Sequence, residues 1–228
     1  MTSLLVNPSL LGTVTVVRAF GSHNLEGIFI VGAFVFGVSG GLAAARARLD
    51  IFGVLVLSAT VGMAGGVLRD VLLGMRPSGL FDWRVLLSVF VAGMLAFLFR
   101  IRFSTWTASI DTFDAIGLSL FCVIGTGVAL EYNAGPIPAV VLGAVTAVGG
   151  GVVRDILLRK VPEVLRQDLY AIPAILGSSV IAIGYELHQD QLWWYLLGAG
   201  ICFVIRIFGM VFNVSLPRAE IPEEKNEA

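Results

Sequence analysis

Charged residues are scarce in this sequence. They make up 14% of its 228 residues, against about 25% in an average soluble domain. The net charge is −1 and no block of lysines and arginines occurs, which excludes nucleic acid as an expected partner. The two cysteines, Cys122 and Cys202, lie inside apolar runs. Without Cys-x-x-Cys or Cys/His spacing, we expect buried thiols, no metal site and no cofactor.

Catalytic motifs are also missing. The sequence contains no His-Glu-x-x-His and no Gly-x-Ser-x-Gly, the patterns that place a metal or a nucleophile in many hydrolases. Its apolar segments hold no pair of acids and no Ser/His set that would supply a base. We therefore expect a protein that is not an enzyme.

Long hydrophobic runs dominate what is present. Hydrophobic residues make up 57% of the chain and the mean hydropathy is +0.91, which predicts an all-α integral membrane protein, since about 20 apolar residues span a bilayer. The seven expected spans are Gly27–Ala45, Ile51–Leu73, Val85–Phe99, Phe113–Leu130, Pro138–Leu158, Leu169–Tyr185 and Leu192–Phe212. The third span is short unless it also includes Trp83 and Arg84.

The two ends of the chain differ from this core. Residues 1–25 lack a basic start and a clear cleavage site, so we expect an interfacial segment rather than a cleaved signal peptide. Residues 213–228 form a polar tail. Arginines and lysines favour an outside N-terminus and a cytoplasmic C-terminus by the positive-inside rule. This predicts a multi-pass protein of a bacterial inner (plasma) membrane. The basic residues on the inner side are then Arg46, Arg48, Arg100, Arg102, Arg159, Lys160, Arg166 and Arg218.

An internal repeat organises the chain. The stretch GGVLRDVLLGMRP at 65–77 recurs as GGVVRDILLRKVP at 150–162, and roughly a third of positions match when 34–80 is laid over 119–165. Apolar helices match by chance at many positions, but a repeated Gly-Gly-x-x-Arg-Asp followed by proline at a fixed distance does not arise that way. We infer a duplication.

Each copy contains three spans, so the second copy enters the membrane from the opposite side. The sequence thus predicts two inverted-topology repeats, 26–103 and 110–187, followed by a seventh helix at 191–212. Proteins of this kind place their permeation or binding site between the repeats, on interrupted helices.

Glycines and an arginine coincide in each copy. Glycine loosens a helix, and freed carbonyls must face protein or water. Because Arg69 and Arg154 follow the glycines by about one turn, each arginine lies on the helix face where the glycines leave a gap without side chains. Two simpler interpretations remain open: the glycines allow close helix packing, and the arginines snorkel to the headgroups. The glycines concerned are Gly65, Gly66, Gly149, Gly150 and Gly151.

Several acids accompany these motifs. Asp70 and Asp155 follow the arginines, where they would lie at the pore mouths or pair locally. Asp155 has the i,i+4 spacing for a local pair with Arg159. Asp111 and Asp114 lie at the start of the fourth span. Helix capping explains one of them, and a second acid so close would attract cations at a pore mouth. For Arg206, in the seventh span, we expect snorkelling to the inner surface.

The doubled pattern, with FGVSGGLAAARARLD in the first copy and TAVGGGVVRDILLRKVP in the second, resembles the prokaryotic members of the TRIC family of trimeric intracellular cation channels. The resemblance covers about residues 26–212. It implies a homotrimer with an hourglass pore in each protomer, passage of potassium and sodium, and lipids between subunits. It also implies that spans two and five are kinked at the paired glycines and that Arg69 and Arg154 face the pore.

Two positions differ between the copies of the repeat: Ala64 is equivalent to Gly149, and Phe29 is equivalent to Asp114.

We expect hydroxyls and freed carbonyls to replace part of the ion's hydration, with the arginines held by carbonyls in a closed gate. The alternative is a secondary transporter of a small solute such as glycine, with an arginine binding the solute's carboxylate. The hydroxyl-bearing residues are Ser58, Thr60 and Thr146.

Overall fold

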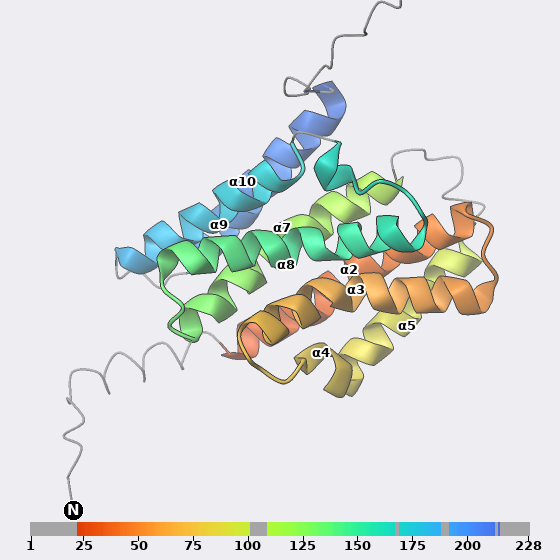
Figure 1. The fold of residues 1–228 in the computed structure, drawn as a ribbon, viewed down its shortest axis with the longest axis horizontal. Coiled ribbons are helices and arrows are strands. Elements are labelled where there is room, and N and C mark those ends of the chain that lie inside the picture. The colour runs from red at the N-terminus through yellow and green to blue at the C-terminus, as the bar shows by residue number, and fades with distance from the viewer. Residues whose placement is uncertain (1–21, 101–108, 167–168, 188–191, 213, 215–228) are drawn as a thin grey trace, which may run out of the picture.

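A computed structural model describes residues 22–100, 109–166, 169–187, 192–212 and 214. Within these residues every regular element is helical (Figure 1). Two elements are short, α4 (Ser78–Phe81) and the 3₁₀ turn η1 (Glu163–Leu165). The long helices are α2 (Ser22–Arg46), α3 (Ile51–Leu72), α5 (Trp83–Leu98), α7 (Ser109–Glu131), α8 (Pro136–Leu157), α9 (Ala171–Glu186) and α10 (Leu192–Phe212).

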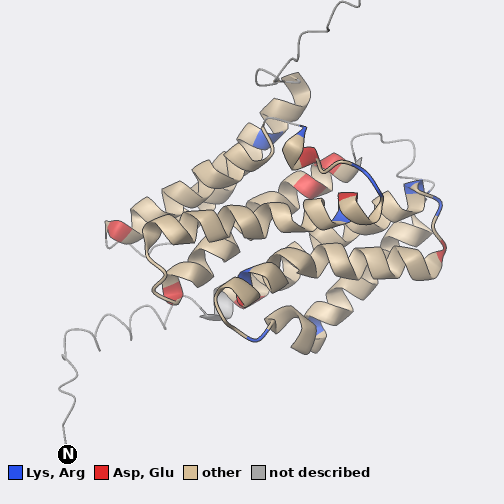
Figure 2. Cartoon of the chain, viewed as in Figure 1, with Lys and Arg blue, Asp and Glu red and all other residues tan. Residues whose placement is uncertain are grey.

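These helices have the character of membrane spans. Five of them are long and apolar enough to cross a bilayer, and α5 and α9 are shorter apolar helices. Large hydrophobic side chains such as Phe52, Ile137 and Trp193 point outward, and charged residues gather mainly toward helix ends (Figure 2). An outer surface of this kind is stable against lipid and not against water. The chain is an all-helical membrane protein.

The helix starts are fixed by local sequence. Asp50 precedes α3 and its carboxylate accepts the Gly53 N–H at 2.7 Å. Asp82 does the same for α5. At α8, Gly135 has a φ of 82° and Pro136 occupies the first turn, where a missing N–H has no cost. These three helices therefore begin at a residue that satisfies or removes a free donor.

The ends of α3 and α8 share a left-handed cap. Gly74 follows α3 with a φ of 67°, and Arg159 follows α8 with a φ of 56°. In each case the next residue donates its N–H to a carbonyl five residues back, of Asp70 and Asp155 respectively. The two caps occupy equivalent positions in the sequence repeat, but only the first uses glycine, the residue that this conformation favours.

The most enclosed helices are α2 and α7. About two-thirds of the α2 span and more than three-quarters of the α7 span are buried, against about a fifth of α10. These two helices contact each other, and Phe121 of α7 meets Phe29 and Phe36 of α2 edge to face at 5.7 and 5.1 Å. They form the core on which the other helices pack.

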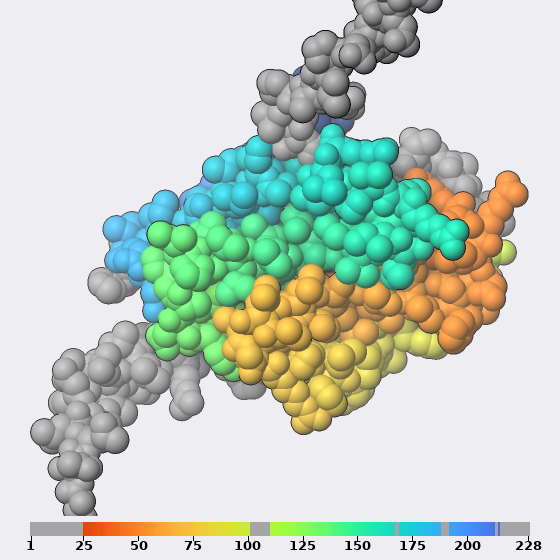
Figure 3. Space-filling view, in the orientation of Figure 1, coloured from red at the N-terminus to blue at the C-terminus, as the bar shows by residue number. Residues whose placement is uncertain are grey.

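The remaining helices surround this core in two similar sets. α3 and α5 contact α2, whereas α8, α9 and α10 contact α7. α3 and α8 run in opposite directions and lie side by side on one face (Figures 1 and 3). α2 and α7 also run in opposite directions, as do α5 and α9. This contact between α3 and α8 brings the two copies of the glycine and arginine motif together.

Each of the seven expected spans overlaps one of these long helices, and α9 begins at Ala171, two residues after the expected start. The short third span does begin at Trp83. Residues 1–21 of the expected interfacial segment, and the polar tail apart from Val214, lie outside the described residues.

Candidate functional site

The first charged centre lies at the end of α3. Arg69 is buried and donates from Nε and Nη2 to Oδ1 of Asp70 at 2.8 and 2.6 Å. The other oxygen of Asp70 accepts both the backbone N–H and the hydroxyl of Ser78, at 2.7 and 2.8 Å. The guanidinium also lies 5.5 Å from the Phe29 ring centroid. The carboxylate thus joins the arginine to the connector that follows α3.

The second charged centre lies at the end of α8 and has more partners. Arg154 donates from Nε to Asp155 at 2.9 Å and from Nη1 to Asp114 at 2.7 Å and Ser39 at 3.1 Å. Its Nη2 lies 3.5 Å from Oε1 of Glu163. The other Asp155 oxygen accepts the Glu163 N–H at 2.9 Å. One buried guanidinium therefore ties together α8, α7, α2 and the connector to α9.

These contacts correct three expectations. Asp155 pairs with Arg154 and the Glu163 backbone, so the predicted local pair with Arg159 is wrong. The partners of Arg69 and Arg154 include carboxylates, where carbonyls were expected, because a charge-assisted bond is stronger and carbonyls within a continuous helix are already used. Snorkelling is also wrong for both, since their side chains are 4% and 3% exposed.

The centres differ at two equivalent positions. Asp114 faces Arg154, whereas the apolar ring of Phe29 stands at the matching place beside Arg69. Glu163 adds a carboxylate to the α8 centre, whereas Ser78 occupies that place in the α3 centre. As a result, Nη1 of Arg69 is buried without a hydrogen-bond partner among the described residues. The α3 centre has one carboxylate for its arginine and the α8 centre has three.

The paired glycines form the contact between α3 and α8. A Cβ on Gly65 would collide with the Thr146 carbonyl, and one on Gly150 would lie 2.8 Å from the Val61 carbonyl. Gly149 approaches the Cα of Gly65 in the same way. Both helices continue through these glycines without interruption. In this structure the glycines allow two backbones to touch, the packing interpretation left open by the sequence.

The outer glycines of each motif make room for aromatic rings. A Cβ on Gly66 would meet the Phe29 ring at 2.7 Å, and one on Gly151 would collide with the Tyr170 hydroxyl. Tyr170 directly precedes α9 and is buried. These two glycines therefore admit the rings of Phe29 and Tyr170, which lie beside Arg69 and Arg206 respectively.

The three hydroxyl residues and Asp111 lie apart from one another. Ser58 donates to the Val89 carbonyl of α5 at 2.8 Å. Thr60 and Thr146 donate to carbonyls four residues back in their own helices. Asp111 is half-buried in the first turn of α7. Thr146 lies at the α3–α8 contact, against Gly65.

Sequence reasoning missed Glu163 and assigned Arg206 to the lipid surface. Arg206 is 1% exposed, so snorkelling is wrong. It donates from Nη2 to Glu163 at 3.2 Å and from Nη1 to the Leu169 carbonyl at 3.2 Å, and it covers the Tyr170 ring at 4.5 Å. The signal was present, since an arginine within a span needs a partner and Glu163 begins the turn before α9.

Glu163 lies outside the spans and has an unusual acidity. Burial raises the pKa of its carboxyl from 4.5 to about 7. Arg154 opposes this rise, Asp114 and Asp111 add to it, and Arg206 opposes it. The carboxyl therefore gains and loses its proton near neutral pH, the range in which histidine is otherwise the usual switch.

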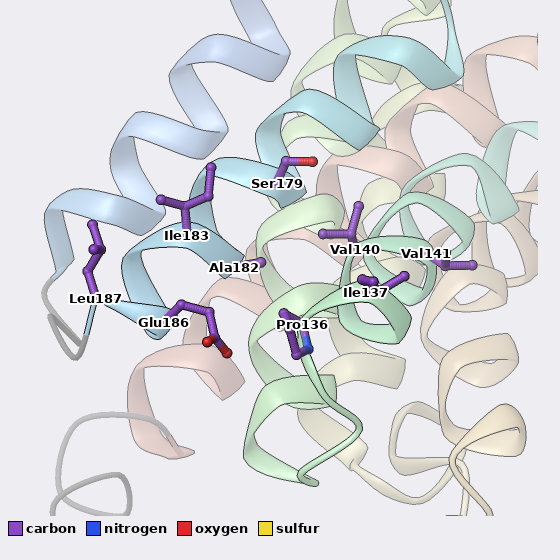
Figure 4. Close-up of a pocket in the computed structure, with 9 residues that line it drawn as sticks. All are labelled: Pro136, Ile137, Val140, Val141, Ser179, Ala182, Ile183, Glu186 and Leu187. Carbon is purple, nitrogen blue, oxygen red and sulfur yellow. The ribbon is translucent and has the colours of Figure 1, made fainter.

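A separate pocket of about 390 Å³ lies between the start of α8 and the end of α9 (Figure 4). Its lining is apolar apart from Ser179 and Glu186, and it contains none of the candidate residues. No three His, Cys, Asp or Glu side chains in the described part of the chain are grouped as metal ligands.

Comparison with known proteins places these features in a family. A family model described as "Glycine transporter" matches residues 28–100 and 111–186. The chain is 35% identical over 199 residues to the UPF0126 inner membrane protein YadS of Escherichia coli, covering 85% of this chain and 95% of that protein. A UPF0126 membrane protein of Streptomyces coelicolor is 41% identical over 198 residues, covering 86% and 90%.

Solved structures agree with the sequence relatives. The TRIC trimeric intracellular cation channel orthologue from Rhodobacter sphaeroides superposes with a TM-score of 0.81 at 30% identity, covering 85% of this chain and all of that one. A structure reported for conductance through TRIC cation channels gives a TM-score of 0.78 at 33% identity, covering 86% and 97%. The chain belongs to the UPF0126 family of membrane proteins, the bacterial TRIC family.

Proposed function

We propose that this protein is a monovalent cation channel that passes potassium and sodium. The observation that carries the proposal is the pair of buried arginine centres on α3 and α8, in a fold shared with solved cation channels. A charged residue is costly within a bilayer and marks a conduction path or a gate more often than a structural site.

The pore of each protomer runs along the contact between α3 and α8. Arg69 and Arg154 each lie four residues beyond a glycine of that contact, Gly65 and Gly150. Because the helices run in opposite directions and Gly65 meets Gly149 and Thr146, the two centres lie on opposite sides of the contact, about 14–18 Å apart along it at 1.5 Å per residue. A narrow waist between two wider charged ends is the hourglass form that the family resemblance implies.

The closed state is the one described above. Carboxylates hold both guanidiniums in place, and the backbones of α3 and α8 touch at Gly65, Gly149 and Gly150. Opening bends the two helices at these glycines, which frees carbonyls to replace water around the ion. The carboxylates of Asp70, Asp114 and Asp155 then balance the arginine charges and favour cations over anions.

The wider assembly follows the same reasoning. Opposite helix directions in the two copies (Figure 1) and a family model that matches two stretches support an inverted repeat. The relative YadS is described as an inner membrane protein, which supports a bacterial inner membrane, and the positive-inside rule favours a cytoplasmic C-terminus. A solved neighbour is described as trimeric, which supports a homotrimer, and the family resemblance implies lipid between its subunits.

Planar-bilayer recording in asymmetric potassium chloride tests the channel. Purified protein is compared with the Arg69→Ala, Arg154→Ala double variant and with Arg84→Ala, a control on the exposed surface. We expect unitary currents that reverse near the potassium potential, a changed open probability in the double variant, and no change in the control. Equal currents in wild type, the double variant and the control would show that neither arginine acts in the ion pathway.

A secondary transporter of a small solute is the second candidate. The matching family model is described as a glycine transporter, and the buried Nη1 of Arg69 without a partner suits a substrate carboxylate. Uptake of labelled glycine into liposomes separates the two functions. Saturable uptake that other small amino acids compete away, with no unitary currents, would favour the transporter.

A further inference from the structure

The α8 centre is tied to the seventh helix by one side chain. The carboxylate of Glu163 reaches Arg154 with Oε1 at 3.5 Å and Arg206 with Oε2 at 3.2 Å. Arg206 belongs to α10, which has no counterpart in the sequence repeat, and its side chain is 2% exposed. Glu163 therefore bridges an arginine of the repeat and an arginine outside it.

The charge of this bridge can change. With Glu163 ionised, the α8 centre holds three carboxylates, from Asp114, Asp155 and Glu163, against two guanidiniums. With Glu163 protonated, the charges balance. The α3 centre contains one arginine and one aspartate, and Ser78 occupies the position of Glu163. A proton on the connector thus alters only one of the two centres.

We propose that Glu163 and Arg206 are positioning residues for Arg154, and that the charged Glu163 carboxylate holds Arg154 in its closed position while its protonation releases that hold. The proposal rests on the channel function above. In this arrangement Arg206 of α10 keeps its place, and Glu163 holds Arg154 of α8 in position relative to it.

The surroundings of Glu163 support this role. Its side chain is 26% exposed, so protons from bulk water reach it. Its backbone N–H remains bonded to Asp155 whether or not the carboxyl is protonated. Burial places its pKa at about 7. The charged and titratable groups that face it are Arg154 and Asp155 from α8, Asp111 and Asp114 from α7, Arg206 from α10 and Tyr170 at the start of α9.

The test is a pH profile of open probability, recorded between about pH 5.5 and 8.5 with each side of the bilayer titrated in turn. Wild type is compared with Glu163→Gln, Arg206→Gln and Glu186→Gln, the last being an exposed glutamate away from the centre. We expect the open probability of wild type and Glu186→Gln to rise several-fold as the pH falls through about 7. Glu163→Gln is expected to stay high and flat.

Arg206→Gln distinguishes positioning from a general loss of structure. Removing a cation beside a carboxyl raises its pKa, so the midpoint moves upward by about one pH unit or more in this variant. A flat profile in wild type, or a pH dependence that survives Glu163→Gln, would overturn the proposal.

Infrared difference spectra between the acidic and alkaline ends of this range give a readout that needs no current. We expect a protonated-carboxyl band that titrates near pH 7 in wild type, is absent in Glu163→Gln and shifts its midpoint upward in Arg206→Gln. If the protein carries no current, the channel function fails, and the infrared titration still decides whether Glu163 and Arg206 are coupled. Absence of that band in folded wild type, or a midpoint unmoved in Arg206→Gln, would overturn the coupling.

Discussion

The number of carboxylates around each arginine predicts an unequal response to the same substitution. Asp70 and Asp155 make matching contacts: one oxygen accepts from the preceding arginine and the other from a backbone N–H of the following connector. Asparagine at either position keeps one acceptor and turns its amide N–H₂ toward a donor on the other side. Both variants therefore create one donor–donor conflict. Asp70 accepts four hydrogen bonds and Asp155 two, since the oxygens of Asp70 also accept from a second guanidinium nitrogen and from the Ser78 hydroxyl.

The larger difference is the charge left behind. Asp70→Asn leaves Arg69 without any carboxylate partner, because Phe29 stands where Asp114 stands in the second copy. An uncompensated buried charge costs about 3–5 kcal/mol. After Asp155→Asn, Arg154 still has the carboxylates of Asp114 and Glu163. The remaining cost is an unsatisfied buried group, about 1–3 kcal/mol. We expect Asp70→Asn to be more destabilising by about 2 kcal/mol.

The assay is equilibrium unfolding of purified protein in mixed micelles, with the free energy of unfolding measured for wild type, both variants and Glu26→Gln. Glu26 pairs with Arg84 on the exposed surface at 3.4 Å, and its substitution is expected to leave stability unchanged. If Asp70→Asn proved equal to Asp155→Asn, or milder, the difference in carboxylate count would have no energetic meaning and the reasoning would be refuted.

Two further predictions concern the backbone. Gly65→Ala forces a methyl group against the Thr146 carbonyl and is expected to lower unfolding stability by about 1–3 kcal/mol, whereas Gly200→Ala, which meets open space, is expected to raise it by up to about 1 kcal/mol. A Gly65→Ala variant with unchanged unfolding stability would show that α3 and α8 separate easily. Arg159→Gly is expected to raise stability by about 1 kcal/mol and Gly74→Ala to lower it by a similar amount, since both residues have positive φ. If Arg159→Gly and Gly74→Ala shifted the melting temperature in the same direction, this interpretation would be contradicted.

Several features of the fold were predictable from the sequence. The spans follow from apolar length, because lipid requires every backbone donor to be satisfied within a helix. The duplication follows from a motif too specific for chance, and it predicted that Arg69 and Arg154 occupy equivalent places. The structure confirms the helical character and the position of each long helix.

The partners of those residues could not be predicted in this way. Arg154 bonds to Ser39 and Asp114, which are 115 and 40 residues away in sequence, and which face of α2 and α7 turns toward α8 depends on how all the helices pack. Local spacing favoured Arg159 as the partner of Asp155, but Arg159 leaves the helix in a left-handed conformation, which separates the two side chains.

The sequence by itself determined that two glycine-and-arginine motifs would exist in equivalent helices of a membrane protein, because composition and periodicity act locally along the chain. Only the tertiary structure decided that the glycines join α3 to α8, that three carboxylates serve one arginine and a single carboxylate the other, and that Arg206 is buried against Glu163. Burial of a charge within a bilayer is stable only with a partner, and that partner is chosen by the packing of helices far apart in sequence.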